Sequence, residues 1–341
     1  MMKQELLKDV IRHVDITKIN PTAIIDAMRE MSFSSRDTAI AADILQRMIN
    51  DNGCTNWLIL AGSTSAGGCM QVYVDMIRFN MIDCVVATGA SVIDMDFFEA
   101  LGYKHYKGTP FIDDKQLRKY YIDRIYDTFI DENELQHCDS AIKTIADTLE
   151  TRPYSSREFL RETGHWLTQH AVKKNSLIQT CYEHNVPIFV PAFSDCSAGF
   201  GLVMHQTERI KAKKTFLTID SVADFRELTQ IKLAAQTSGL FMIGGGAPKN
   251  FAQDTVVCAE CLGYDVPMHQ YAVQITVADA RDGACSSSTL KEASSWGKVD
   301  TLYEQMVYAE ATTVVPLIVS YAYHKGDWQK RKKYNWSNLF N

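Results

Sequence analysis

NWLILA, residues 56–61, leads directly into the small-residue segment GSTSAGG, residues 62–68. The first run has the length and apolar character of a buried strand, and the second has the composition of a loop. An amphipathic pattern then continues to Asn80, and a further apolar run covers residues 82–88. Strand, loop, helix and strand in this order predict a βαβ unit with parallel strands and a right-handed crossover.

The same alternation returns in the second half of the chain. Strand patterns cover residues 186–191, 215–219, 240–243 and 271–276, and helical patterns follow the second and the third of these strands. Strands that alternate with helices indicate an α/β fold with a doubly wound, mostly parallel sheet of the Rossmann-like kind.

The first fifty residues, 1–50, are expected to form a helical N-terminal segment. Pro21 is well placed to open one helix through Met31, and Ser34 with Asp37 predicts the capped start of a second helix that ends near Asn50. These helices precede the first strand of the predicted sheet.

The segment 113–176 is charged, has mostly helical patterns and is expected to be a helical insertion beside the sheet. No stretch of the chain has the composition of a linker, and no internal repeat is visible. We therefore expect residues 1–341 to form a single domain with helical additions.

The composition is that of an ordinary globular protein, with 46% apolar and 22% charged residues. A net charge of −6 argues against a nucleic-acid partner, which normally requires a basic face. No run approaches the ~20 apolar residues that cross a bilayer, and the N-terminus has no apolar signal region. Nine scattered cysteines suggest reduced thiols, so we expect a cytoplasmic protein without a membrane partner.

Two local patterns are interpreted as structural rather than functional. CAEC, residues 258–261, has no second pair at zinc-ligand spacing, so no metal site is expected, and two buried helix cysteines are favoured over a redox pair. The basic run at residues 330–333 is interpreted as a solvated end.

Glycine-rich loops follow two of the predicted strands. The loop at residues 62–68 lacks the G-x-G-x-x-G spacing, so by itself it favours a tight turn without a ligand over a phosphate site. The triplet Gly244, Gly245 and Gly246 costs chain entropy and offers no packing, which favours close approach of the backbone to a ligand. Both loops are expected at the carboxyl edge of the sheet, where open α/β folds bind ligands.

Acidic residues also follow the predicted strands, namely Asp94, Asp195, Asp282 and Glu310. One such acid is usually a helix cap or a solvated group. Four in one fold suggest contacts with ribose hydroxyls or amines. No Walker loop, H-E-x-x-H or G-x-S-x-G motif is present to support phosphoryl transfer, zinc proteolysis or serine hydrolysis.

Lys298 closes the segment KEASSWGK, residues 291–298, and stands beside an indole and a carboxylate. A lysine that attacks a carbonyl or an imine must be uncharged, and a pocket with an aromatic wall favours that form by desolvation. The alternative interpretation is a surface lysine that follows a turn.

Four motifs occur in one order: NMID at 80–83 with Thr88, IGGG at 243–246, EASSWGK at 292–298, and YAEATTVVPL at 308–317. From about residue 58 to residue 323 the chain resembles the deoxyhypusine synthase family. The resemblance implies NAD as cofactor and a homotetramer with each active site at a dimer interface. It also implies that a lysine holds the aminobutyl group of spermidine as an imine and passes it to a lysine of a translation factor. Related enzymes pass the group to putrescine instead.

Carried over by this resemblance, Lys298 matches the nucleophile, and Trp296 and Glu292 match the amine pocket, together with the triplet 244–246. The positions that match the cofactor contacts are Ser63, Thr64, Ser65, Thr88, Asp94, Asp195, Ala278, Asp282, Glu310 and Ala311. The loop 62–68 is about two residues shorter than in the family, and Glu310 replaces the usual aspartate.

Three positions of the implied polyamine pocket depart from the family. Asn250 stands where a histidine is expected, and Phe200 and Cys285 stand where acids are expected. The sequence therefore predicts an NAD-dependent aminoalkyl transferase that acts on a polyamine-type donor, with weak activity on spermidine. The alternatives are homospermidine synthase-like transfer between small amines and a catalytically silent NAD-binding scaffold.

Overall fold

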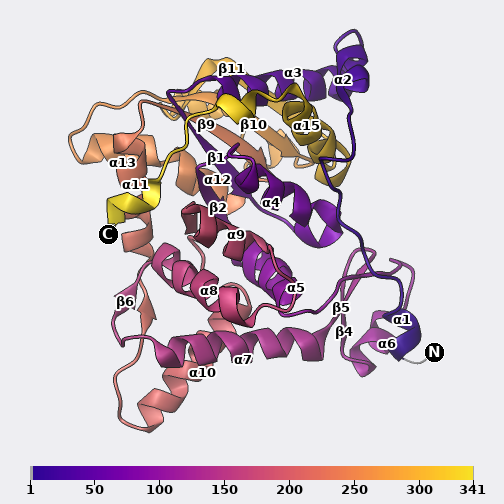
Figure 1. The fold of residues 1–341 in the computed structure, drawn as a ribbon, viewed down its shortest axis with the longest axis vertical. Coiled ribbons are helices and arrows are strands. Elements are labelled where there is room, and N and C mark those ends of the chain that lie inside the picture. Colours follow the sequence, from indigo (N-terminus) through magenta and orange to yellow (C-terminus); the bar gives the residue numbers. More distant parts are fainter. Residues whose placement is uncertain (1–2, 341) are drawn as a thin grey trace.

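The computed structural model describes residues 3–340, and its centre is a six-stranded parallel sheet (Figure 1). The spatial order of the strands is β11-β10-β9-β1-β2-β7, so the direction of winding reverses between β1 and β9. The predicted α/β fold with a doubly wound, mostly parallel sheet is confirmed. The strands are β1 (Cys54–Leu60), β2 (Cys84–Ala87), β7 (Ile188–Phe189), β9 (Thr237–Ile243), β10 (His269–Thr276) and β11 (Val299–Tyr308).

The position of β1 in the centre of the sheet explains why residues 57–61 are apolar without alternation. All seven of its residues are buried, because β2 and β9 flank it and helices cover both faces of the sheet. Leu58 and Leu60 belong to the core on one face, and Trp57 and Ile59 to the core on the other. The side chains of β1 therefore pack into two hydrophobic cores, one on each face of the sheet.

Different helices cover the two faces of the sheet. The core that contains Leu58 also holds side chains of α3 (Phe33–Asn50), α4 (Met70–Arg78) and α15 (Ala311–Lys325). The core that contains Trp57 holds side chains of α11 (Ser221–Ala234), α12 (Gly246–Gln253) and α14 (Leu290–Ser295). The helix α13 (Thr255–Cys261) follows α12 directly and contacts α11.

A large insertion separates β2 from β7. Its helix α7 lies alongside α10, which follows β7, at the end of the molecule opposite α3 (Figure 1). From β2 onwards, up to the start of β9, the additional elements are η2 (Ala90–Phe97), α5 (Phe98–Ala100), β3 (Tyr106–Lys107), α6 (Asp114–Lys119), β4 (Ile122–Ile125), β5 (Thr128–Asp131), α7 (Glu132–Thr148), β6 (Pro153–Tyr154), α8 (Ser156–His170), α9 (Leu177–His184), α10 (Ser197–Lys211) and β8 (Thr218–Ile219).

The segment 113–176 contains α6, α7 and α8, and each helix begins with a side-chain cap from Asp113, Asp131 or Ser155. It also contains the hairpin β4–β5, which pairs with β3 in a small antiparallel sheet that the helical prediction missed.

The division of the chain into domains stays a prediction.

Two predictions about the elements, a strand and a helix cap, were wrong, and one strand was missed. The strand predicted at 215–219 shrinks to β8, which pairs with β6 outside the main sheet. The strand β11 was not predicted, although it pairs with β10 along the edge of the sheet. The helix α3 begins at Phe33 without a side-chain cap, and the hydroxyl of Ser34 donates instead to the carbonyl of Tyr308 at 2.9 Å.

The remaining elements are short. The N-terminal helix α2 ends at Met28 rather than at Met31. Among residues 3–340, no helix combines the length and the apolar character needed to cross a membrane. The short elements are α1 (Lys3–Leu6), α2 (Thr22–Met28), η1 (Ser65–Cys69), η3 (Ala280–Asp282), η4 (Asp327–Lys330) and η5 (Trp336–Phe340).

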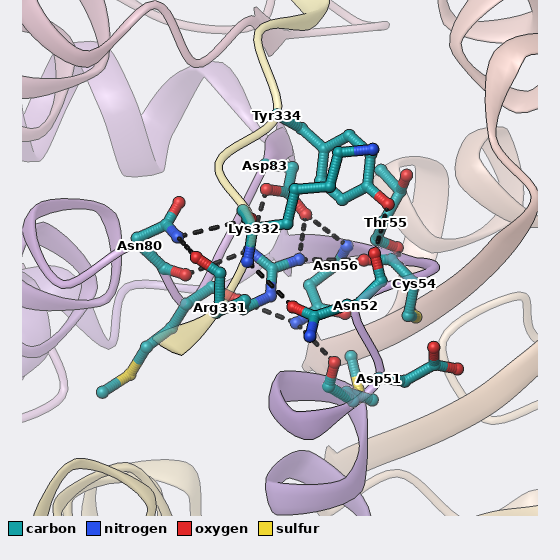
Figure 2. Close-up of polar contacts among 12 residues, drawn as sticks. Asp51, Asn52, Cys54, Thr55, Asn56, Asn80, Asp83, Arg331, Lys332 and Tyr334 are labelled. Carbon is teal, nitrogen blue, oxygen red and sulfur yellow. Dashed lines mark hydrogen bonds and ion pairs between the residues drawn. The ribbon is translucent and has the colours of Figure 1, made fainter. Parts of the chain in front are cut away.

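The basic run near the C-terminus is anchored by one residue, Arg331, so the prediction of a solvated end was wrong for Arg331, whereas the lysines at 330, 332 and 333 are exposed as expected. Figure 2 shows Arg331 at the amino-terminal ends of β1 and β2, where its guanidinium contacts both carboxylate oxygens of Asp83. The Arg331 side chain is 0% exposed and that of Asp83 is 1% exposed. Arg331 also donates to the carbonyls of Asn80 at 3.0 Å and Cys54 at 2.9 Å. This buried ion pair ties the C-terminal segment to the sheet.

Candidate functional site

A cleft of about 400 Å³ opens at the carboxyl edge of the sheet, where the winding reverses between β1 and β9. This position is the switch point at which open α/β sheets bind their ligands. We call it the switch-point cleft. It is lined by Ala61, Gly62, Ala87, Thr88, Gly89, Pro191, Ala192, Asp195, Gly244, Gly245, Gly246, Ala247, Pro248 and Ser286.

The glycine triplet brings the backbone close to its neighbours in this cleft. Gly244 has φ of +76°, a conformation that side chains rarely adopt, and a Cβ on Gly245 would lie 2.6 Å from the carbonyl oxygen of Ser286. The triplet also starts α12 at Gly246. The glycines therefore cost chain entropy, but they permit a tight loop that leaves open space at the edge of the sheet.

Two of the predicted cofactor residues, Thr88 and Asp195, line the switch-point cleft. Asp94 is not among the lining residues, and its carboxylate accepts a hydrogen bond from the backbone of Ser197 at 2.8 Å. Burial raises the pKa of Asp94 to about 6. In this chain, Asp94 joins η2 to the start of α10.

The other predicted cofactor residues lie outside the cleft lining and have local partners. Thr64 shares a hydrogen bond of 2.7 Å with the hydroxyl of Tyr73, Asp282 accepts from the backbone of Ala284 at 2.7 Å, and Glu310 caps the start of α15. Their cofactor contacts stay predictions. The remaining positions of this group are Ser63, Ser65, Ala278 and Ala311.

A second and larger cleft, of about 840 Å³, contains the predicted nucleophile. We call it the lysine cleft. It lies between α11, α12, α13 and α14, and the loop that precedes α14 closes one side. Its lining residues are Phe225, Asn250, Gln253, Asp254, Val257, Cys258, Cys261, Gly283, Cys285, Ser288, Glu292, Ala293, Trp296 and Lys298.

Lys298 is held in this cleft by the turn between α14 and β11. Its backbone nitrogen donates to Ala293 at 3.0 Å, and its carbonyl accepts from His269 at 3.0 Å. The residue is only 9% exposed, and its Nζ lies 2.5 Å from a carboxylate oxygen of Asp254 and 3.3 Å from the amide oxygen of Asn250. A nearly buried amine thus faces a cleft and has a single carboxylate beside it.

Trp296 and Glu292 lie in the same cleft but differ in their roles. Trp296 is 70% exposed, and the centre of one of its rings is 5.2 Å from Lys298 Nζ, within cation–π range. Glu292 forms a capping box at the start of α14, in which the backbone nitrogen of Thr289 donates to its carboxylate at 2.6 Å. The hydrogen bonds from Thr289 lower the pKa of Glu292, so this carboxylate stays ionised at the rim.

The three departures from the family lie in different places. Asn250 lies in the lysine cleft and donates to Asp254 at 2.7 Å. Cys285 lies in the same lining, and its thiol donates to the carbonyl of Gly246 at 3.2 Å. Phe200 is exposed on α10 and lines neither cleft.

One loop forms a wall between the two clefts. Ser286 lines the switch-point cleft, whereas its neighbours Cys285 and Ser288 line the lysine cleft. A buried lysine, Lys249, supports this wall through hydrogen bonds from its Nζ to the hydroxyl of Ser288 at 2.8 Å and the carbonyl of Cys285 at 3.3 Å. Burial lowers the pKa of Lys249 to about 8. The two clefts are therefore neighbours that share a thin wall.

Sequence reasoning missed Asp254, the carboxylate that contacts Lys298. The available signal was an acid four residues after Asn250, a spacing that places both side chains on one side of a helical turn. Its pairing with a residue forty-odd positions further along needs the tertiary structure, because the two segments meet only through the sheet.

The cysteines at 258 and 261 were expected to be buried, and that expectation was wrong. Cys261 is exposed, Cys258 is half-buried, and both line the lysine cleft at the end of α13. Within residues 3–340, no cluster of three or more histidine, cysteine or acidic side chains is placed to hold a metal ion.

A six-stranded parallel sheet with a reversed winding order and a glycine-walled switch-point cleft defines a doubly wound α/β protein of the ligand-binding type. Residues 23–322 match the family model of deoxyhypusine synthase. The chain belongs to the deoxyhypusine synthase family.

Relatives of this chain carry the same family name. It is 67% identical to a deoxyhypusine synthase-like protein of Caulobacter vibrioides over 99% of this chain and 92% of that protein. It is 37% identical to a probable deoxyhypusine synthase 2 of Methanosarcina mazei over 92% of this chain and 89% of that protein. A solved structure from Entamoeba histolytica, assigned to deoxyhypusine synthase, has the same fold, with a TM-score of 0.60 at 17% identity over 96% of this chain and 99% of that one.

Proposed function

We propose that this protein is an NAD-dependent aminoalkyl transferase that holds the transferred group as an imine on Lys298. The observation that carries this proposal is the position of Lys298, a nearly buried amine in a large cleft beside a second cleft of the nucleotide-binding kind. An amine of this kind can form a covalent imine with a carbonyl or iminium carbon. Membership of the deoxyhypusine synthase family supports the same chemistry.

The switch-point cleft is suited to NAD. Its backbone-lined glycine loop leaves room for a phosphate group, and Thr88 and Asp195 can hydrogen-bond to hydroxyls. When bound, NAD would accept a hydride from the amine donor. The thin wall at residues 285–288 would then separate the cofactor from Lys298. This loop must therefore allow the donor carbon to reach the cofactor and Lys298 in turn.

The partners in this proposal are a polyamine-type donor and an amine acceptor, either a lysine on a translation factor precursor or a second small amine. We extend the proposal to a cytoplasmic homotetramer. A second chain would account for the predicted site residues that lie apart from both clefts in one chain, such as Phe200 and Glu310.

NAD binding is expected to be measurable by calorimetry and sensitive to the glycine triplet. Gly245→Ala places a Cβ 2.6 Å from the backbone of Ser286, so the wall must shift and the affinity for NAD should fall at least about tenfold. Gly53→Ala, at the opposite edge of the sheet and with φ in the ordinary range, is the matched control and should bind normally. A wild-type protein that neither retains nucleotide after purification nor binds added NAD contradicts the cofactor proposal.

A panel of amines is expected to identify the donor through a covalent adduct on Lys298. Enzyme and NAD are mixed with spermidine, putrescine, agmatine or homospermidine, reduced with borohydride, digested and examined by mass spectrometry. Spermidine should react weakly, since removal of the partner of a buried charge costs about 3–5 kcal/mol and two family acids are Phe200 and Cys285 here.

Efficient formation of deoxyhypusine from spermidine on a factor precursor would show that these two substitutions do not control the donor. A product built from two small amines would favour the homospermidine-type reaction. If no amine leaves an adduct while NAD still binds, the silent scaffold replaces the transferase.

A further inference from the structure

Asp254 is the carboxylate placed to work on the amine of Lys298. Its two oxygens have separate partners, because one lies 2.5 Å from Lys298 Nζ and the other accepts from the amide of Asn250 at 2.7 Å. Asn250 in turn offers its amide oxygen to Lys298 at 3.3 Å. The three side chains form a closed triangle in the lysine cleft.

The position of Asp254 has no structural explanation in the helices around it. It stands between α12 and α13, and its carboxylate does not cap the start of α13. Among residues 3–340, the carboxylate bonds only to Asn250 and Lys298, and its side chain remains 29% exposed towards the cleft. The carboxylate is therefore oriented by Asn250 and reachable by a substrate.

The other ionisable groups of the lysine cleft either bond to other parts of the protein or make no contact with the amine of Lys298. Lys249 is bound to the wall at Ser288, Glu292 caps α14, and Cys285 donates to Gly246. Cys258 and Cys261 line the cleft from α13 without a hydrogen bond or ion pair to Lys298. Asn250 can hydrogen-bond but cannot exchange a proton. Asp254 is the group in this part of the chain that can both contact the amine and carry its proton.

We propose that Asp254 is a catalytic residue that takes the proton from Lys298 as the imine forms and returns it as the leaving amine departs. This inference rests on the proposed function, because it assigns the proton transfers of the imine step. It places the acid–base group of the site at the junction of α12 and α13, at a position that the family motifs did not single out.

Once the donor had lost a hydride to bound NAD and become an iminium ion, the ammonium of Lys298 would pass one proton to Asp254. The free amine attacks the iminium carbon, a new C–N bond forms at Nζ, and one proton moves from Nζ to the donor nitrogen. The bond to that nitrogen breaks, and the departing amine takes the proton from Asp254. The carboxylate is then ionised again beside the cationic imine of Lys298, which it stabilises as a counterion.

The test uses butanal, a four-carbon aldehyde with no amine on which to cyclise, with cyanoborohydride, so that imine formation on Lys298 is measured without NAD or amine oxidation. Asp254→Asn keeps the size and removes the proton-carrying group. It should lower the rate of adduct formation at neutral pH by about 10²-fold, the usual contribution of a positioned acid–base group. The remaining rate should rise towards alkaline pH as hydroxide replaces the carboxylate, whereas the wild-type rate changes less.

Two further variants control this measurement. Asp254→Glu retains a carboxylate and should recover a large part of the rate. Glu260→Gln changes an exposed acid of α13 that does not line the cleft, and its rate should equal that of the wild type. Circular dichroism and NAD calorimetry on all variants report any loss of folding separately.

The result that overturns the proposal is an Asp254→Asn rate equal to or above that of the wild type, because loss of the charge alone favours the free amine. In that case the wild type still forms its adduct, and the proposed function stands. If the wild type reacts with the aldehyde but with no amine plus NAD, the oxidation fails and the role of Asp254 stands. If the wild type forms no adduct with the aldehyde, both proposals fall.

Discussion

Lys298→Arg is expected to abolish aminoalkyl transfer and the borohydride-trapped adduct. Arginine can still form an ion pair with Asp254, but its guanidinium remains charged at any working pH and cannot attack an imine. Loss of a covalent nucleophile typically costs ~10³-fold or more in rate, so the residual activity should be near the background.

The affinity for NAD should be nearly unchanged in Lys298→Arg, since Lys298 lines a different cleft from the one proposed for NAD. Lys291→Arg is the matched control, because Lys291 is exposed on α14, the helix that precedes the turn of Lys298, and it should behave like the wild type. Transfer activity that survives in Lys298→Arg, measured by mass analysis of the products, would rule out the covalent route.

Arg331→Met is expected to lower the free energy of unfolding by about 3–5 kcal/mol. The replacement leaves the carboxylate of Asp83 buried without its partner, and removal of one member of a buried ion pair costs about this amount. Arg331 also supplies hydrogen bonds to the carbonyls of Asn80 and Cys54, so the ends of β1 and β2 lose partners together (Figure 2).

Denaturant titration of Arg331→Met measures this loss, with Lys330→Met as the control, because Lys330 is exposed one residue earlier. The double variant Arg331→Met with Asp83→Asn should be less destabilised than the sum of its single changes, since no unpaired charge remains buried. A single Arg331→Met variant within about 1 kcal/mol of the wild type would show that the anchor contributes little.

The interior strands of the sheet were predictable because they are buried on both faces. A run such as residues 57–61 is apolar throughout, and this signal is independent of its neighbours. The edge strand β11 gave a weaker signal. Most of it is only partly buried, so its sequence mixes charged and apolar residues, and the chain alone did not identify it.

The strand predicted at 215–219 failed for a different reason. Apolar β-branched residues report local propensity, but the choice of a partner strand is made by the tertiary structure. There, β8 pairs with β6 of the insertion instead of joining the main sheet.

The sequence by itself determined the alternating α/β fold, the glycine loop after β9 and the identity of Lys298 as the candidate nucleophile, because each depends on residues close together in the chain. Only the tertiary structure decided which carboxylate meets that lysine and where the basic C-terminal run lies. Asp254 reaches Lys298 across the lysine cleft, and Arg331 reaches Asp83 across 248 positions of sequence. Local patterns carry no information on such pairs, since charge pairing at long range depends on where folding of the sheet brings the two segments.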